Sequence, residues 1–233
     1  MFLDDPQRFR QLDPDDMLGH INALPDQLEA AWQHAQAQPL PDSFRAARLI
    51  VITGMGGSAI GGDYLAALVE ESSPVPILVN RDYALPAFVR GPEVLVIASS
   101  HSGNTEEALS AFEQARQRGA MLLAVTTGGE LAARAGQAGV PLWRFTYPSQ
   151  PRAAFGWSFG LLAGLAQRLN LAGDLSADVE EAVALLRRTQ EQFGAETPAV
   201  ENPAKRYAGQ LVGRIGVFFG GGIMAPIARR WKT

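Results

Sequence analysis

The chain has 233 residues, 47% of them hydrophobic and 19% charged, a composition that is ordinary for a folded interior and argues against disorder. Its formal net charge of −4 provides no electrostatic footprint for nucleic acid or for an anionic membrane, so neither partner is expected. The absence of cysteine and the scatter of only three histidines predict no disulfide, no metal site and no cofactor.

Residues 1–42 are expected to form an N-terminal helical segment. Their polar, acidic start lacks the apolar core of a signal peptide, and no apolar run in the chain approaches the roughly 20 residues that span a bilayer. The expected location is therefore the cytoplasm. Residues 14–36 place apolar side chains at helical spacing, with Pro14 and two aspartates in the first turn and a kink or break at Pro25.

Residues 43–153 alternate short apolar runs with Ala-rich helical segments. The expected strands are Leu49–Thr53, Pro76–Asn80, Val94–Ser99, Met121–Thr127 and Leu142–Thr146. The expected helices between them are Ser58–Glu70, Thr105–Arg118 and Glu130–Ala138. Three of the strands are near-continuous apolar runs, as is typical of strands covered on both faces. The order predicts an α/β fold, with a doubly wound, parallel, five-stranded sheet flanked by helices.

Residues 154–201 are expected to form a helical connector. Helical composition extends over residues 152–170 and 177–193. A further helix is expected over Pro203–Gly213, because Asn202 is a favourable N-cap and a proline follows it.

Residues 202–233 look like the start of a second, incomplete copy of the first domain. The segment 214–222 (RIGVFFGGG) repeats residues 48–56 (RLIVITGMG) in register and predicts another strand running into glycines. Because one strand and one helix cannot bury their own apolar surface, we expect a truncated chain. Residues 214–233 should then be poorly ordered unless a partner chain covers them.

The first loop, residues 54–62 (GMGGSAIGG), directly follows a strand and opens a helix. Glycines allow a ligand to approach the backbone, and the free N–H groups of a helix start point at an anion. Ser58 adds a hydroxyl donor. The alternative is a tight turn with no ligand. The spacing of Gly54, Gly56 and Ala59 also fits a variant of the dinucleotide fingerprint.

The second loop, residues 99–107 (SSHSGNTEE), follows the strongest strand. Ser100, Ser102 and Thr105 surround one glycine at a helix start, which is typical of a phosphate-binding nest with added side-chain donors. The simpler alternative is that Thr105 only caps the helix. His101 lies between two serines, and we expect its side chain to point away from them.

Three further segments carry distinctive patterns: QPRAA at 150–154, NPAKR at 202–206 and ARRWK at 228–232. Together with the two loops, and in this order, they resemble the sugar isomerase (SIS) domain family and, within it, the bifunctional phosphoglucose/phosphomannose isomerases. The resemblance covers nearly the whole chain after residue 40. It implies a homodimeric two-domain isomerase that converts glucose 6-phosphate or mannose 6-phosphate to fructose 6-phosphate through a cis-enediolate.

The resemblance also implies roles for individual residues. The hydroxyls of the second loop would bind the phosphate, and the first loop would line the sugar. The substrate-binding residues would be Gly56, Gly57, Ser58, Ser100, Ser102 and Thr105. Arg152 would be the catalytic residue, because a fixed guanidinium near the reacting carbons stabilises the enediolate charge. A surface arginine after a proline turn is the simpler alternative.

The reaction also needs a base and a group that opens the sugar ring. In the family these are a Glu and a His that would follow residue 233. The carboxylates nearest the motifs are expected to be solvated or capping: Asp63, Glu106, Glu107 and Glu130. The sequence therefore supports binding more strongly than turnover.

Two other functions stay open. One is a non-catalytic sugar-phosphate-binding module on the same domain. The other is a nucleotide-binding oxidoreductase, which predicts an acidic residue at the end of the second strand. That strand ends at Asn80-Arg81, and an oxidoreductase would leave the second loop without a role.

Overall fold

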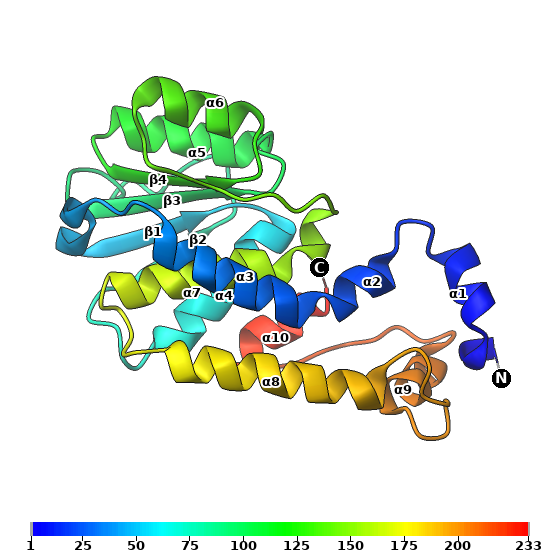
Figure 1. Ribbon diagram of the computed structural model, residues 1–233. Coiled ribbons are helices and arrows are strands. Elements are labelled where there is room, and N and C mark those ends of the chain that lie inside the picture. Colours follow the sequence, from blue (N-terminus) through cyan, green and yellow to red (C-terminus); the bar gives the residue numbers. More distant parts are fainter. Residues whose placement is uncertain (1, 233) are drawn as a thin grey trace.

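The computed structural model describes residues 2–232, and its centre is a five-stranded parallel sheet (Figure 1). The strands are β1 (Leu49–Thr53), β2 (Ile77–Asn80), β3 (Val94–Ser100), β4 (Met121–Thr126) and β5 (Leu142–Arg144), in the order β2-β1-β3-β4-β5. In the register of the sheet, Val51 faces Leu78 on one side and Val96 on the other. The doubly wound sheet predicted from the sequence is confirmed.

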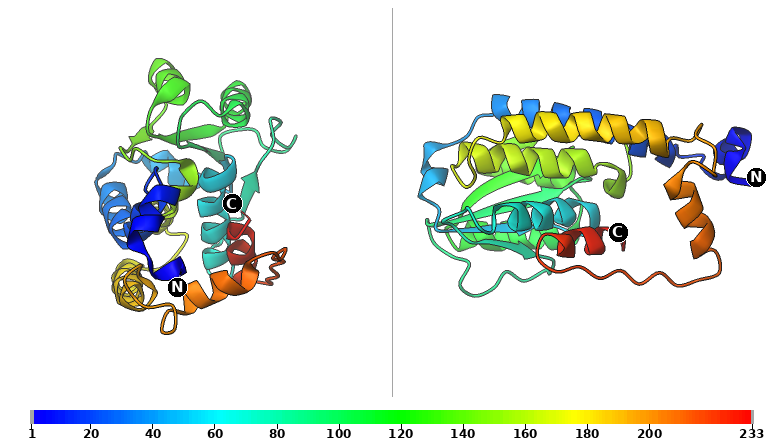
Figure 2. Two further views of the ribbon diagram at one scale, coloured as in Figure 1. Left: turned by 90° about the vertical axis from the view of Figure 1, so that its right-hand side faces the viewer. Right: turned by 90° about the horizontal axis from the view of Figure 1, so that it is seen from below.

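Helices cover both faces of the sheet (Figures 1 and 2). One face carries α3 (Leu24–Ala37), α4 (Gly56–Val69) and α7 (Phe155–Arg168), and the other carries α5 (Glu106–Gln117) and α6 (Gly129–Ala138). After β1 the chain crosses to β2, and it then returns past β1 to β3 on the other side. The carboxyl ends of β1 and β3 thus flank the point where the strand order reverses, where ligands bind in open α/β sheets.

Small residues allow α7 to lie unusually close to α3. A Cβ atom built on Gly160 would lie 2.8 Å from the Cβ of Ala31, and one on Gly164 would lie 2.5 Å from the Cβ of Ala35. Ala31 and Ala35 are fully buried. The N-terminal helix is therefore part of the packed domain.

The single helix predicted over residues 14–36 is wrong in detail. Two helices, α2 (Met17–Asn22) and α3, are separated at Ala23, close to the break expected at Pro25. The Asp13 carboxylate accepts hydrogen bonds of 2.8 Å from the first two amides of α2, so the helix begins after Pro14 rather than with it. Two short elements precede it: a 3-10 helix at Phe2–Asp4 and α1 (Pro6–Leu12).

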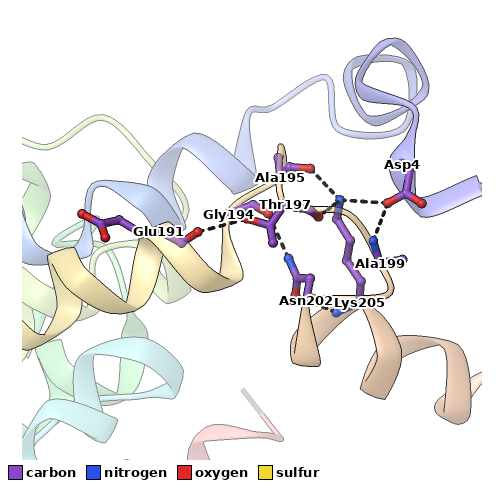
Figure 3. A network of polar contacts seen from close by, with 8 residues as sticks. All are labelled: Asp4, Glu191, Gly194, Ala195, Thr197, Ala199, Asn202 and Lys205. Carbon is purple, nitrogen blue, oxygen red and sulfur yellow. Dashed lines mark hydrogen bonds and ion pairs between the residues drawn. The ribbon is translucent and has the colours of Figure 1, made fainter.

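Beyond the sheet, α8 (Ser176–Phe193) runs along α3, and α9 (Pro203–Leu211) turns away from it (Figure 2). The predicted cap is confirmed, since Asn202 Oδ1 accepts a bond of 3.1 Å from the amide of Lys205. Figure 3 shows the Lys205 ammonium between the carboxylate of Asp4 and two backbone carbonyls of the α8–α9 loop. In residues 2–232 no helix is long and apolar enough to cross a membrane.

The strand predicted over residues 214–222 is wrong. The segment has no regular structure and leads into a helix, α10 (Met224–Arg230), that packs beside α4 (Figure 2). The apolar side chains of Ile215 and Phe219 are 93% and 91% exposed. A strand forms only where another strand completes its hydrogen bonds, and among the described residues no strand pairs with this segment.

Candidate functional site

The first and second loops lie in contact at the carboxyl ends of β1 and β3. The Ser58 hydroxyl, which is almost fully buried, accepts a hydrogen bond of 3.1 Å from the amide of His101. A Cβ on Gly54 would lie 2.5 Å from the carbonyl oxygen of Ser99, so only glycine fits there. The two loops are therefore in direct contact at the switch point of the sheet.

The three hydroxyls of the second loop lie within one tight turn. The Ser100 and Thr105 hydroxyls are 2.9 Å apart, and Ser100 Oγ accepts a bond from the amide of Gly103. Ser102 Oγ accepts a bond from the amide of Asn104. One hydroxyl of the Ser100–Thr105 pair donates to the other, so the pair keeps one proton for an outside acceptor. The Ser102 hydroxyl also keeps its proton for an outside acceptor.

Thr105 occupies the N-cap position of α5, but its side chain makes no capping hydrogen bond within the described residues. Its hydroxyl turns toward Ser100 instead. The first amides of α5 therefore keep their donors for an external anion, and the helix dipole favours negative charge at this point. The geometry favours the nest over the simple cap.

Residues at the end of β4 support the second loop, and the sequence analysis missed them. The Thr127 hydroxyl donates to the carbonyl of His101 over 2.7 Å. Asn104 Oδ1 accepts a bond of 3.0 Å from the amide of Glu130 at the start of α6. The available signal was the TTGG run at 126–129, because β4 neighbours β3 and its polar end must lie beside the second loop.

Arg152 lies exposed in a short 3-10 turn, Pro151–Ala153. Its guanidinium donates two bonds, of 2.9 and 2.7 Å, to the side-chain oxygen of Gln150, and no carboxylate among residues 2–232 forms an ion pair with it. A Cβ on Gly57 would lie 2.4 Å from the carbonyl oxygen of Pro151, so the turn lies against the first loop. Gly56, exposed and at φ +47°, opens α4 next to it.

The side chain of His101 points away from the loop hydroxyls, as expected. Its ring packs edge-on against Phe145, and Nε2 donates to the carbonyl of Tyr147 over 3.1 Å. Burial lowers the pKa of His101, although the bond to the carbonyl opposes that change. His101 is therefore a neutral bracing group between the second loop and the chain after β5.

The lowered pKa of His101 predicts a specific loss of stability in acid. The unfolded chain binds the proton more readily than the folded protein, so the contribution is full above the ordinary pKa of 6.5 and is lost as the pH falls below it. Thermal unfolding followed from pH 7.5 to 5 should therefore show a smaller decrease in Tm for His101→Gln than for the unmodified protein. An equal decrease would contradict the assignment.

The carboxylates near the loops are mostly engaged elsewhere. Asp63 forms ion pairs with Arg81 and Arg229. Glu106 accepts a bond of 3.0 Å from the hydroxyl of Tyr83, which raises the pKa of that tyrosine. Glu130 pairs with Arg134 on its own helix. The described residues also contain no group of three or more His, Cys, Asp or Glu that could hold a metal ion.

Comparison with known proteins gives three findings. Residues 43–137 match the SIS domain family. The chain is 40% identical to the bifunctional phosphoglucose/phosphomannose isomerase of Caldicellulosiruptor bescii over 93% of its own length and 64% of the relative's. It is 36% identical to the protein of the same name from Aquifex aeolicus, over 78% of this chain and 53% of the relative. The chain thus spans between half and two thirds of the length of these relatives.

A solved structure extends the likeness of the fold. The C-terminal domain of glucosamine-fructose-6-phosphate aminotransferase from Francisella tularensis superposes with a TM-score of 0.63 over 92% of this chain and 64% of that chain, at 14% identity. At this identity the likeness shows the fold alone.

Proposed function

The chain belongs to the SIS domain family through residues 43–137, and from this premise we propose that it binds a hexose 6-phosphate for aldose–ketose isomerisation. The substrates would be glucose 6-phosphate and mannose 6-phosphate, and the product fructose 6-phosphate. Relatives named bifunctional phosphoglucose/phosphomannose isomerase support this assignment. Because these relatives are isomerases by name, they also support isomerisation as the class of reaction. We also propose that the protein is a homodimer.

One observation carries the proposal: the Ser100–Thr105 hydroxyl pair lies at the uncapped start of α5, at the switch point of the sheet. The one proton that this pair keeps, the Ser102 hydroxyl and the first amides of α5 would donate to the phosphate oxygens. Gly56 and Gly57 would line the sugar: Gly56 leaves the start of α4 open, and Gly57 lets the Arg152 turn lie against it. Ser58 would hold the two loops together and keep its own proton for a sugar hydroxyl.

Arg152 would stabilise the reaction's intermediate. Moving a proton between C1 and C2 passes through a cis-enediolate, whose oxygens gather negative charge. Among the described residues, the guanidinium of Arg152 donates to the neutral side chain of Gln150 and forms no ion pair with a carboxylate. The proton transfer itself needs a base, and three of the four carboxylates near the motifs, Asp63, Glu106 and Glu130, already have ionic or hydrogen-bonding partners.

This engagement of the carboxylates favours a second candidate function, a sugar-phosphate-binding module without turnover. One measurement distinguishes the two candidate functions. The protein is incubated with glucose 6-phosphate or mannose 6-phosphate in deuterated water and followed by proton NMR. Deuterium at C2 together with fructose 6-phosphate supports the isomerase, whereas binding without deuterium supports the module. A protein that neither binds nor exchanges would refute both.

A further inference from the structure

We infer that Gln27 and Tyr147 are positioning residues that hold the Arg152 turn and the second loop in one fixed arrangement. The inference rests on the proposed function and extends it to two residues that lie outside the segment matched to the SIS domain family, 43–137.

Gln27 connects α3 to the Arg152 turn. It is 3% exposed, and its side-chain nitrogen lies 2.9 Å from the carbonyl oxygen of Ala153, the residue after Arg152. The same nitrogen lies 3.1 Å from the carbonyl oxygen of His20 and 2.9 Å from the hydroxyl of Tyr147. Two of these acceptors are carbonyls, which only accept, so the nitrogen rather than the oxygen of the amide must face them, and its two N–H groups are shared among the three acceptors.

Tyr147 connects the same point to the second loop. Its carbonyl accepts the bond from His101, and its hydroxyl contacts both Gln27 and the ring nitrogen Nδ1 of His20. A continuous path of hydrogen bonds therefore runs from His101 through Tyr147 and Gln27 to Ala153. The three hydrogen bonds of this path measure between 2.9 and 3.1 Å. The carbonyl and the hydroxyl of Tyr147 are joined by the covalent bonds of that residue.

The polarity of Gln27 argues for a role beyond packing. A buried polar atom is costly unless it is hydrogen-bonded, and the side-chain oxygen of Gln27 has no partner among residues 2–232. Its Cβ lies against Gly156 of α7, and the next contacts along this interface are made by the apolar residues Leu28 and Ala31. A leucine would satisfy that packing without the cost. A leucine side chain cannot, however, donate a hydrogen bond to the carbonyl of Ala153, the residue after Arg152.

The test uses two probes that share a phosphate. Inorganic phosphate reports on the second loop alone, whereas 6-phosphogluconate also carries a carboxylate at C1, where the enediolate charge would develop. In calorimetric titrations, Gln27→Leu and Tyr147→Phe should each weaken 6-phosphogluconate binding about threefold to thirtyfold and leave inorganic phosphate unchanged. In an Arg152→Met background, Gln27→Leu should have no further effect.

Leu28→Ala is the matched control, because Leu28 is buried on the same helix and its side chain forms none of the hydrogen bonds of the path. It should lower the Tm without changing the ratio of the two affinities. The inference is wrong if Gln27→Leu and Tyr147→Phe lower the affinities for both probes equally. It is also wrong if Gln27→Leu lowers the affinity for 6-phosphogluconate as much in the Arg152→Met background as in the unmodified protein. In either case, fructose 6-phosphate binding by the unmodified protein still supports the proposed function. Failure of the unmodified protein to bind fructose 6-phosphate would overturn both.

Discussion

Replacing Ser100 by alanine and Thr105 by valine in one variant should weaken fructose 6-phosphate binding about tenfold to a hundredfold. Both hydroxyls lie at the start of α5, 2.9 Å from each other. The pair keeps one proton for the phosphate, and a hydrogen bond to a charged group contributes about 1.5–3 kcal/mol, which corresponds to a factor of about ten to a hundred in affinity. Isothermal titration calorimetry measures the change directly.

Ser110→Ala is the control for this variant. Ser110 lies on the same helix, but its hydroxyl donates to the carbonyl of Tyr83 and not to the hydroxyls of the second loop. Its removal should leave the dissociation constant unchanged. Because Ser100 also accepts a bond from the amide of Gly103, the double variant should lose some stability as well. A dissociation constant equal to that of the unmodified protein would refute the phosphate site.

Gly103→Ala should both destabilise the protein and abolish phosphate binding. Gly103 has a φ of +71°, and a Cβ there would lie 1.9 Å from the carbonyl oxygen of Gly128, a backbone atom that cannot turn aside. The second loop and the end of β4 must therefore separate. The left-handed conformation alone costs about 1–2 kcal/mol for an L-residue, and the displacement adds to that cost.

Gly119→Ala separates these two effects. Gly119 has a φ of +68°, nearly the same as Gly103, but nothing lies within 4 Å of its Cβ position. It should therefore lose only the conformational part of the stability and keep full affinity for fructose 6-phosphate. Urea unfolding and calorimetry on both variants make the comparison. Equal losses of stability together with retained binding in Gly103→Ala would show that the contact with Gly128 does not shape the site.

The sheet could be predicted from the sequence because its signals are local. β1 was located to the residue, since a run of buried β-branched side chains followed by glycines has few other interpretations. The two loops followed from the strands, because polar residues directly after parallel strands lie at one edge of the sheet. The prediction of a strand over residues 214–222 was wrong because strand formation also depends on distant residues. The segment has the composition of a strand, but within the described part of the chain it has no neighbouring strand to pair with.

The supports of the site could not be predicted, because they join distant parts of the chain. The bond from Gln27 to the carbonyl of Ala153 spans 126 positions, and no periodicity or motif links these residues. The bond from Thr127 to the carbonyl of His101 likewise depends on the neighbourhood of β3 and β4. Local patterns thus located the residues proposed to touch the ligand, whereas tertiary packing determined the residues that hold them.

The most direct test of the account is amide mapping by nitrogen-15 NMR, with fructose 6-phosphate and fructose compared as ligands. Binding of the phosphate by the second loop predicts that fructose 6-phosphate shifts the amides of Ser102, Gly103 and the first turn of α5, and that fructose alone leaves them in place. Equal shifts with both sugars, or shifts with fructose 6-phosphate that avoid the second loop, would contradict the account.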